Sequence, residues 1–286
     1  MLKRKLYKAC LIMACFMFMA VSSGSRPADK KTGNPLPVEH KTGMHHFDSS
    51  GLCTCIPFTV KEELAHAPRI QLNKNAAPFV NGYIKKNGFF LGKTKDRNAP
   101  YFTIMDSVFE KDELPVELKY LAFVESGLKY NVKSWSGAIG PWAFMPKAAK
   151  QYGLKIWGKN DERLNYYKST QAAAGLLSDL FVKYGDWLLV IAAYNCGPGG
   201  VQKAIKKSGS RNYWILQNFL PEETRKHVKK FIAVHYHFEG HGGVTTLTKA
   251  ETETHIKAVA AFVKKQQVPI AIGMENCDSL SVVVAK

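Results

Sequence analysis

Apolar residues recur every three or four positions along much of this chain, the spacing that places them on one face of an α-helix. Residues 60–112 contain the first such stretch, where Phe102, Met105 and Phe109 follow the spacing. A second stretch covers residues 114–127 and also has one apolar face. We therefore predict a helical lead-in over the first range and a short helix over the second.

Two further helices are predicted in the middle of the chain. Thr170 is a candidate cap for a helix whose apolar stripe ends at Tyr184, and Gly185 suits its exit. Residues 187–195 are apolar around the whole helix, so this helix should be buried. The Cys-Gly-Pro-Gly run at 196–199 should then stop it.

The C-terminal part of the chain continues the helical pattern. Pro221 suits the first turn of a long helix that ends near Phe238. Residues 249–266 could form a basic helix, and residues 280–285 could begin a strand. Because few strands are indicated anywhere, we expect a mainly α fold.

Glu125 lies on the apolar face of the second predicted helix, together with Leu118 and Leu121. Burial there disfavours an ionised carboxylate and favours the protonated acid, which is the form that a general acid needs. A buried carboxylate with a purely structural role is the alternative at this point. Ser126 follows directly, and the glycine-rich turn at 137–140 would let backbone approach a ligand closely.

Tyr194 ends the predicted buried helix, immediately before Asn195. A buried phenol hydroxyl needs a hydrogen-bond partner. The carboxyl group of Glu125 is our candidate for that partner.

Four motifs of chemical interest follow one another along the chain. They are Glu125-Ser126, GAIGPWAFMP at 137–146, AYNCGPG at 193–199 and LPEETRKHV at 220–228. In this order and spacing they resemble the goose-lysozyme-like lytic transglycosylases, and among these the membrane-bound lytic transglycosylase D type. The similarity runs from about Tyr101 to about Tyr236 and implies a lysozyme-like helical catalytic domain, which we place at residues 113–240.

The resemblance also implies a reaction with a single acid. Glu125 would protonate the glycosidic oxygen between N-acetylmuramic acid and N-acetylglucosamine in the glycan strands of peptidoglycan. It would then accept the proton of the muramyl 6-hydroxyl, which closes onto the anomeric carbon and leaves a 1,6-anhydro product. Ordinary glycosidases instead use two carboxylates, and none of the nearby acids, Asp161, Glu162, Asp179 and Asp186, falls in a matched motif. Asp186 is better interpreted as a helix N-cap.

The same resemblance assigns the positions that contact the substrate. Ser126 and Tyr194 would orient Glu125 by hydrogen bonds, while Asn195 would hold an N-acetyl group. The full set of implied substrate-binding residues is Ser126, Phe144, Met145, Tyr194 and Asn195, with the Phe144-Met145 pair acting through its backbone.

Two positions depart from the pattern of the family. Ala143 stands where the family usually has Gln, and His227 stands where it usually has Tyr. Both positions line the glycan cleft in the family, so the departures bear on glycan affinity and subsite preference. They leave the catalytic acid in place.

Two other functions remain open on the sequence. A hydrolase on the same scaffold would use water in place of the 6-hydroxyl. A glycan-binding protein that has lost catalysis is permitted by Ala143 and His227, although binding alone does not require a buried acid such as Glu125.

Composition and charge narrow the range of partners. The chain has 286 residues with 46% hydrophobic residues and a formal net charge of +17, so it can form a sizeable core and suits a polyanionic partner. The lysines are scattered and not interleaved with aromatic residues, which argues against a nucleic-acid-binding strip. An acidic wall polymer is favoured, and a basic surface without a specific partner is the alternative. The oligomeric state is not indicated.

We predict neither a cofactor nor a metal. The sequence has no phosphate-binding loop and no nucleotide fingerprint. His235 and His237 face different sides of a helix and cannot easily share a metal ion. Cys53 and Cys55 lack the second cysteine pair of a zinc site.

The N-terminal region suggests export. Residues 1–23 combine a basic start, a short apolar run and small residues, the pattern of a signal peptide. Lipidation at Cys15 is the alternative and would anchor the protein to a membrane. Residues 24–58 are rich in Lys, Gly, Pro, Ser and His and should form a flexible linker, while residues 241–286 form a tail without a family match. We expect a protein of the periplasm or cell envelope.

Overall fold

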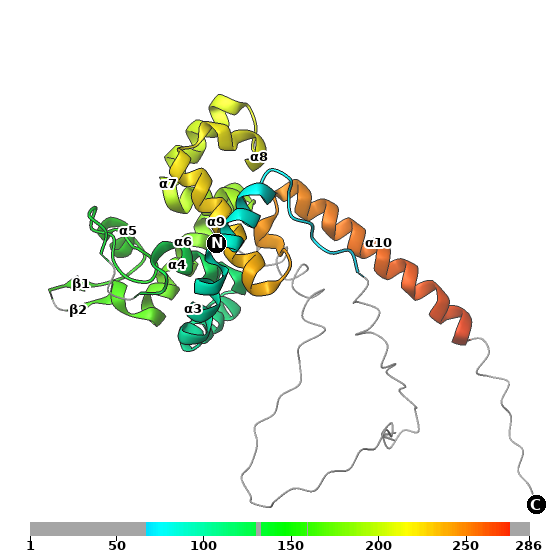
Figure 1. Cartoon of the computed structure of the whole chain (residues 1–286), viewed down its shortest axis with the longest axis horizontal. Helices are drawn as coiled ribbons and strands as arrows, with labels where there is room; N and C mark the ends of the chain where they lie inside the picture. Colours follow the sequence, from blue (N-terminus) through cyan, green and yellow to red (C-terminus); the bar gives the residue numbers. More distant parts are fainter. Residues whose placement is uncertain (1–66, 130–132, 159, 275–286) are drawn as a thin grey trace, which may run out of the picture.

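The computed structural model describes residues 67–129, 133–158 and 160–274, with side chains as far as residue 265. Within these ranges the chain is mainly helical, which confirms the predicted fold class (Figure 1). In chain order, with η for 3₁₀ helices, the elements are α3 (Ala77–Lys111), η2 (Val116–Leu118), α4 (Lys119–Ser126), α5 (Pro146–Gln151), β1 (Ile156–Trp157), β2 (Asn160–Asp161), η3 (Glu162–Leu164), α6 (Tyr166–Tyr184), α7 (Trp187–Ser208), α8 (Tyr213–Leu216), η4 (Gln217–Phe219), α9 (Glu222–Glu239), η5 (Val244–Thr246) and α10 (Lys249–Met274).

Several predictions fall on parts of the chain that the structure does not describe. The leader at 1–23 with Cys15, the linker at 24–58 and the strand at 280–285 lie outside the described residues.

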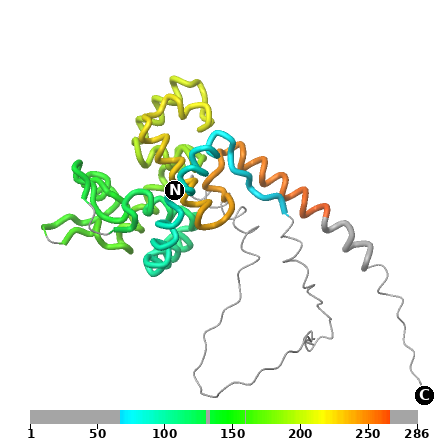
Figure 2. Tube along the Cα trace, viewed as in Figure 1, coloured from blue at the N-terminus to red at the C-terminus, as the bar shows by residue number. Residues whose placement is uncertain are grey.

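Four long helices form the body that supports the rest of the molecule. α3 packs against α6 and α9, α7 packs against both of these helices as well, and α4 contacts α9 (Figure 2). α3 forms the predicted helical lead-in only from Ala77 to Lys111, because the described residues 67–76 before it are not helical; it runs through Pro100 without ending. Its buried face includes Phe102, Met105 and Phe109, as the apolar spacing predicted.

The first half of α7 is the most deeply buried helix segment. Residues 187–193 are all buried, because this stretch has no polar face to present to water. The predicted stop falls at Gly197, which has φ 77° and ψ 159° and breaks the helical geometry. The helix resumes at once with Pro198, whose missing N–H costs nothing in a first turn. The stop is therefore a kink inside α7.

The N-terminus of α6 differs from the prediction. Asn165, and not Thr170, caps this helix, and its side chain accepts a hydrogen bond from the Lys168 N–H at 2.9 Å. Thr170 lies one turn further along, where its hydroxyl donates to the Tyr166 carbonyl at 2.6 Å. The predicted exit at Gly185 is confirmed, with a left-handed φ of 63°.

Asp186 caps two helices at once. The predicted N-cap is confirmed, since Oδ1 accepts from the Leu189 N–H of α7 at 3.1 Å. Oδ2 accepts from the Lys249 N–H at the start of α10 at 2.8 Å. Burial raises the pKa of this carboxyl to about 6. The carboxyl group therefore joins the start of the C-terminal helix to the start of the buried one.

The basic helix predicted at 249–266 is present as α10, which is longer than expected and extends away from the helical body (Figure 1). None of the helices in the described ranges is both long and apolar enough to cross a membrane.

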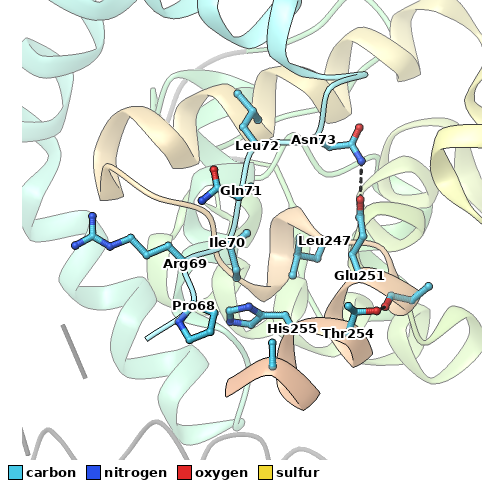
Figure 3. A pocket seen from close by; sticks show the side chains of 12 residues that line it. Pro68, Arg69, Ile70, Gln71, Leu72, Asn73, Leu247, Glu251, Thr254 and His255 are labelled. Atoms are coloured by element: carbon cyan, nitrogen blue, oxygen red, sulfur yellow. Dashed lines mark hydrogen bonds between the residues drawn. The ribbon is translucent and has the colours of Figure 1, made fainter. Parts of the chain in front are cut away.

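A groove of about 540 Å³ separates the first turns of α10 from the extended segment 68–73 (Figure 3). Asn73 closes one side of it, because its Nδ2 donates to Glu251 Oε1 at 2.5 Å. None of the residues lining this groove is a predicted site residue.

Candidate functional site

Glu125 lies in the last turn of α4, at the edge of the core. Leu118 and Leu121 on the same face are fully buried, which confirms the apolar environment that the sequence predicted. Gly127 ends the helix with φ 61° and a backbone hydrogen bond to the Phe123 carbonyl. The Glu125 side chain is 15% exposed, so it is not fully sealed from solvent.

The hydrogen-bond partner of Glu125 is His227 of α9. The distance from His227 Nε2 to Glu125 Oε1 is 2.8 Å, and the His227 side chain is 9% exposed. Its other ring nitrogen, Nδ1, is buried and has no hydrogen-bond partner among the described residues. The sequence marked His227 only as a departure from the family pattern, so its contact with Glu125 is a new finding.

The predicted contacts of Ser126 and Tyr194 with Glu125 are wrong. Ser126 Oγ donates to the Pro141 carbonyl at 2.8 Å, and Tyr194 Oη donates to the Trp142 carbonyl at 2.6 Å. Tyr194 is nonetheless close to the acid: burial raises the pKa of its hydroxyl well above the usual range, and the Glu125 charge raises it further. The two hydroxyls therefore position the glycine-rich turn, and the turn lies beside the acid.

A buried arginine, which the sequence did not indicate, holds the same turn from another side. Arg163 Nη1 donates to the carbonyls of Gly137 and Phe144, each at 3.0 Å. Asp161 pairs with the guanidinium at 2.6 Å, and the hydrogen bond from Arg163 holds the pKa of Asp161 below its usual range. Asp161 and Arg163 stand two residues apart in a polar stretch, and nothing in that local pattern marks Arg163 as buried.

Trp142 anchors the centre of the turn. Its side chain is fully buried, and Nε1 donates to Thr170 Oγ1 of α6 at 2.9 Å. Ser126 of α4, Tyr194 of α7 and Arg163 of η3 donate hydrogen bonds to carbonyls of the turn. The turn's own Trp142 donates in the other direction, to α6. The path of the turn is therefore fixed by the packed helices.

Gly140 is required by this packing. It has φ 84°, and a Cβ placed on it would lie 2.0 Å from the Arg163 carbonyl oxygen. Gly137 also has a positive φ, 89°, but a Cβ there would meet nothing within 4 Å. Close backbone approach thus explains the glycine at position 140, while turn conformation alone explains Gly137.

The backbone of Phe144 is used inside the turn. Its N–H donates to the Ile139 carbonyl at 3.1 Å, and its carbonyl accepts from the Ile139 N–H and from Arg163. Neither group is available to a sugar, which corrects the expectation for Phe144. Met145 is different, because its side chain is exposed where the chain enters α5.

Asn195 lies on α7 just before the kink and faces α9. Its Oδ1 accepts a hydrogen bond from the buried Thr224 hydroxyl at 2.7 Å. Thr224 and His227 stand three residues apart on α9, so this helix contacts both Asn195 and the acid. In the part of the chain that the structure describes, no three His, Cys, Asp or Glu side chains are grouped so that they could hold a metal ion.

Comparison with known proteins relates this arrangement to one family. Residues 109–217 match the family described as Transglycosylase SLT domain. The membrane-bound lytic murein transglycosylase D of Escherichia coli strain K12 is 36% identical over 154 residues, which cover 52% of this chain and 34% of that protein. The peptidoglycan transglycosylase gp16 of Escherichia phage T7 is 31% identical over 146 residues, which cover 49% of this chain and 11% of the phage protein.

Among solved structures, the 70 kDa soluble lytic transglycosylase of Escherichia coli aligns with 52% of this chain and 26% of its own, at 24% identity and a TM-score of 0.45. The family match confirms the resemblance that the motifs indicated. This chain spans about a third of the length of its Escherichia coli relative. The matched range includes Glu125, the turn and Asn195, but His227 lies beyond it.

Proposed function

We propose that this chain, whose residues 109–217 belong to the transglycosylase SLT domain family, is a lytic transglycosylase that cleaves the glycan strands of peptidoglycan. The placement of Glu125 supports this proposal most directly. A carboxyl group at the edge of the core, bonded on one oxygen and partly exposed, is suited to proton transfer. We keep residues 113–240 as the extent of the catalytic domain, because α9 contributes His227 to the site.

In the proposed reaction Glu125 donates its proton to the glycosidic oxygen between N-acetylmuramic acid and N-acetylglucosamine. The bond from that oxygen to the anomeric carbon of the muramyl residue breaks. The muramyl 6-hydroxyl attacks the same carbon while the Glu125 carboxylate accepts the hydroxyl proton. The product is a 1,6-anhydro ring, and the acid returns to its protonated form without any water being consumed.

The four other acids named from the sequence support a mechanism with one carboxylate, because each of them is engaged elsewhere. Asp161 pairs with Arg163 and Glu162 pairs with Lys168. Asp179 accepts a hydrogen bond from the Tyr152 hydroxyl, and Asp186 caps α7 and α10. A retaining or inverting hydrolase would need a second carboxylate facing the bond.

The turn and α7 would supply the contacts to the sugar. Since Thr224 occupies the Asn195 oxygen, the amide of Asn195 would meet an N-acetyl carbonyl as a donor through Nδ2. Met145 would contribute through its exposed side chain. Ser126 and Tyr194 would act on the substrate only through the turn that they hold.

The products of digestion test the proposed reaction. We expect purified chain and purified sacculi to release muropeptides that end in 1,6-anhydromuramic acid, as measured by mass spectrometry. A reducing muramic acid end as the main product would replace this proposal with hydrolysis. Binding to sacculi without any release would indicate a glycan-binding protein that has lost catalysis.

We also propose that the protein is exported and acts at the cell envelope, where its substrate is located. Whether a signal peptide is removed near Ser23 or a lipid is attached at Cys15 decides membrane association. Intact-mass measurement of the protein purified from a membrane fraction and from a soluble fraction would distinguish these two forms.

Replacing Ala143 with Gln is expected to strengthen glycan binding about 2- to 12-fold. Ala143 has φ 47°, so its backbone already tolerates a Cβ in the left-handed region, and Gln adds no further backbone strain. One recovered neutral hydrogen bond to an N-acetyl group is worth about 0.5–1.5 kcal/mol. Steady-state digestion of sacculi gives the apparent affinity.

Ala138→Gln is the matched control for this variant, because it adds the same amide elsewhere on the turn. It should leave the affinity unchanged. If Ala143→Gln is slower than the parent and also melts at a lower temperature, the site has been rebuilt around alanine and the expectation fails.

A further inference from the structure

We propose that His227 is a positioning residue for Glu125 and that it acts as a neutral imidazole, donating its Nε2–H to one carboxyl oxygen of the acid. The transferred proton then resides on the other oxygen of Glu125 and not on the ring. The catalytic part of this inference rests on the proposed function, whereas the protonation pattern can be tested without it.

The contact itself is short and largely protected from water. Nε2 and Oε1 are 2.8 Å apart, and the two side chains are 9% and 15% exposed. They come from α9 and α4, two helices that pack against each other. The geometry therefore holds Oε1 against the ring, and Oε2 is the oxygen left for the substrate.

The second ring nitrogen decides which protonation state fits. His227 Nδ1 is buried and has no partner among the described residues. An imidazolium, or a neutral ring protonated at Nδ1, would place a buried N–H there with no acceptor, and buried unpaired N–H groups are rare. A neutral ring protonated at Nε2 leaves only an unused lone pair at Nδ1. This tautomer is the one that the surroundings permit.

This tautomer assists both halves of the proposed reaction. Before proton transfer, the Nε2–H bond fixes the orientation of the carboxyl group and leaves the proton on Oε2. After transfer, Glu125 is an anion and the same hydrogen bond becomes charge-assisted, which strengthens it. The carboxylate is thus stabilised until it accepts the proton of the 6-hydroxyl.

A neutral ring also explains how His can stand where related sequences usually have Tyr. A phenol hydroxyl and an Nε2–H imidazole each offer one neutral donor to the acid. His227 therefore supplies the acid with the kind of neutral donor that a tyrosine hydroxyl could also offer.

Two substitutions separate a donor from a packing residue. His227→Gln keeps an amide N–H close to the position of Nε2, while His227→Leu keeps the volume and removes the donor. We expect Leu to lower kcat for sacculi about 10- to 100-fold with little change in KM, in line with one hydrogen bond to a charged group. Gln should recover most of that loss. Equal losses in both variants, with unchanged circular dichroism spectra, would overturn the positioning role.

The tautomer is measured directly by nitrogen-15 NMR of the imidazole ring in the full chain at neutral pH. We expect a neutral ring protonated at Nε2, with ring signals that shift in Glu125→Gln because the acceptor has changed. An imidazolium, an Nδ1-protonated ring, or signals that ignore the Glu125 substitution would overturn the inference. This measurement needs no turnover. If the chain does not cleave sacculi, the proposed function is refuted, but the spectrum still decides whether His227 donates to Glu125.

Discussion

Replacing Glu125 with Gln is expected to lower the cleavage of peptidoglycan by at least about 10²–10⁴-fold while the fold persists. General acid–base transfer alone contributes a factor of this size, and here one carboxyl group serves as both acid and base. The Gln side chain has nearly the same shape, and its oxygen can still accept a hydrogen bond from His227 Nε2, which lies 2.8 Å from Glu125 Oε1. What it cannot do is release a proton and take one back.

Glu117→Gln provides the matched control. Glu117 is a second acid of the same segment, half-buried in η2, and burial raises the pKa of its carboxyl. It has no place in the proposed reaction, so turnover should stay within about threefold of the parent. Released muropeptides are counted for all three proteins, with circular dichroism as the measure of folding. Turnover of Glu125→Gln within tenfold of the parent, with an unchanged spectrum, would remove Glu125 from the mechanism.

Replacing Gly140 with Ala is expected to destabilise the protein by about 2–5 kcal/mol. The left-handed φ of 84° costs about 1–2 kcal/mol for a residue with a Cβ. The new Cβ would also lie 2.0 Å from the Arg163 carbonyl oxygen, and forcing atoms into a packed region costs about 1–3 kcal/mol or more. Because the atom it meets belongs to the backbone, no side-chain rotation can relieve the clash.

Gly137→Ala separates the two contributions, since it has the same left-handed conformation in the same turn but open space around its Cβ. We expect it to cost about 1–2 kcal/mol. Urea unfolding of the parent and the two variants gives their free energies of unfolding. Digestion of sacculi shows whether displacing the turn also impairs cleavage. Equal destabilisation of the two variants would mean that the approach of Arg163 to the turn does not constrain Gly140.

Local patterns in the sequence were enough to place most of the longer helices. The apolar spacing located the buried faces of α3 and α4, and the apolar run at 187–195 predicted a buried helix that the structure buries over residues 187–193. Gly185 and Asp186 were assigned correctly because caps depend on neighbouring backbone groups within one turn. These features are set by residues close in sequence, so the chain alone determines them.

Local capping preferences gave the wrong start for α6, because two residues near its beginning are both suitable caps. Asn165 and Thr170 are both able to cap a helix, and only the structure shows that α6 begins at the first of them. Thr170 is instead occupied by Trp142, a partner 28 residues away. A capping preference states that a side chain can bond to backbone, but not whether the fold has another use for it.

At the site, the sequence by itself placed Glu125 among apolar residues and indicated that buried polar groups there need partners. Only the tertiary structure decided which groups those partners are. Glu125 pairs with His227, 102 residues away in sequence, while Ser126 and Tyr194 donate to carbonyls of the turn. The physical reason is that a buried donor must be satisfied by some acceptor, and every carbonyl and carboxylate is eligible until helix packing brings one of them within about 3 Å. The pairing of α4 with α9, and the docking of the turn between α4 and α7, made that choice.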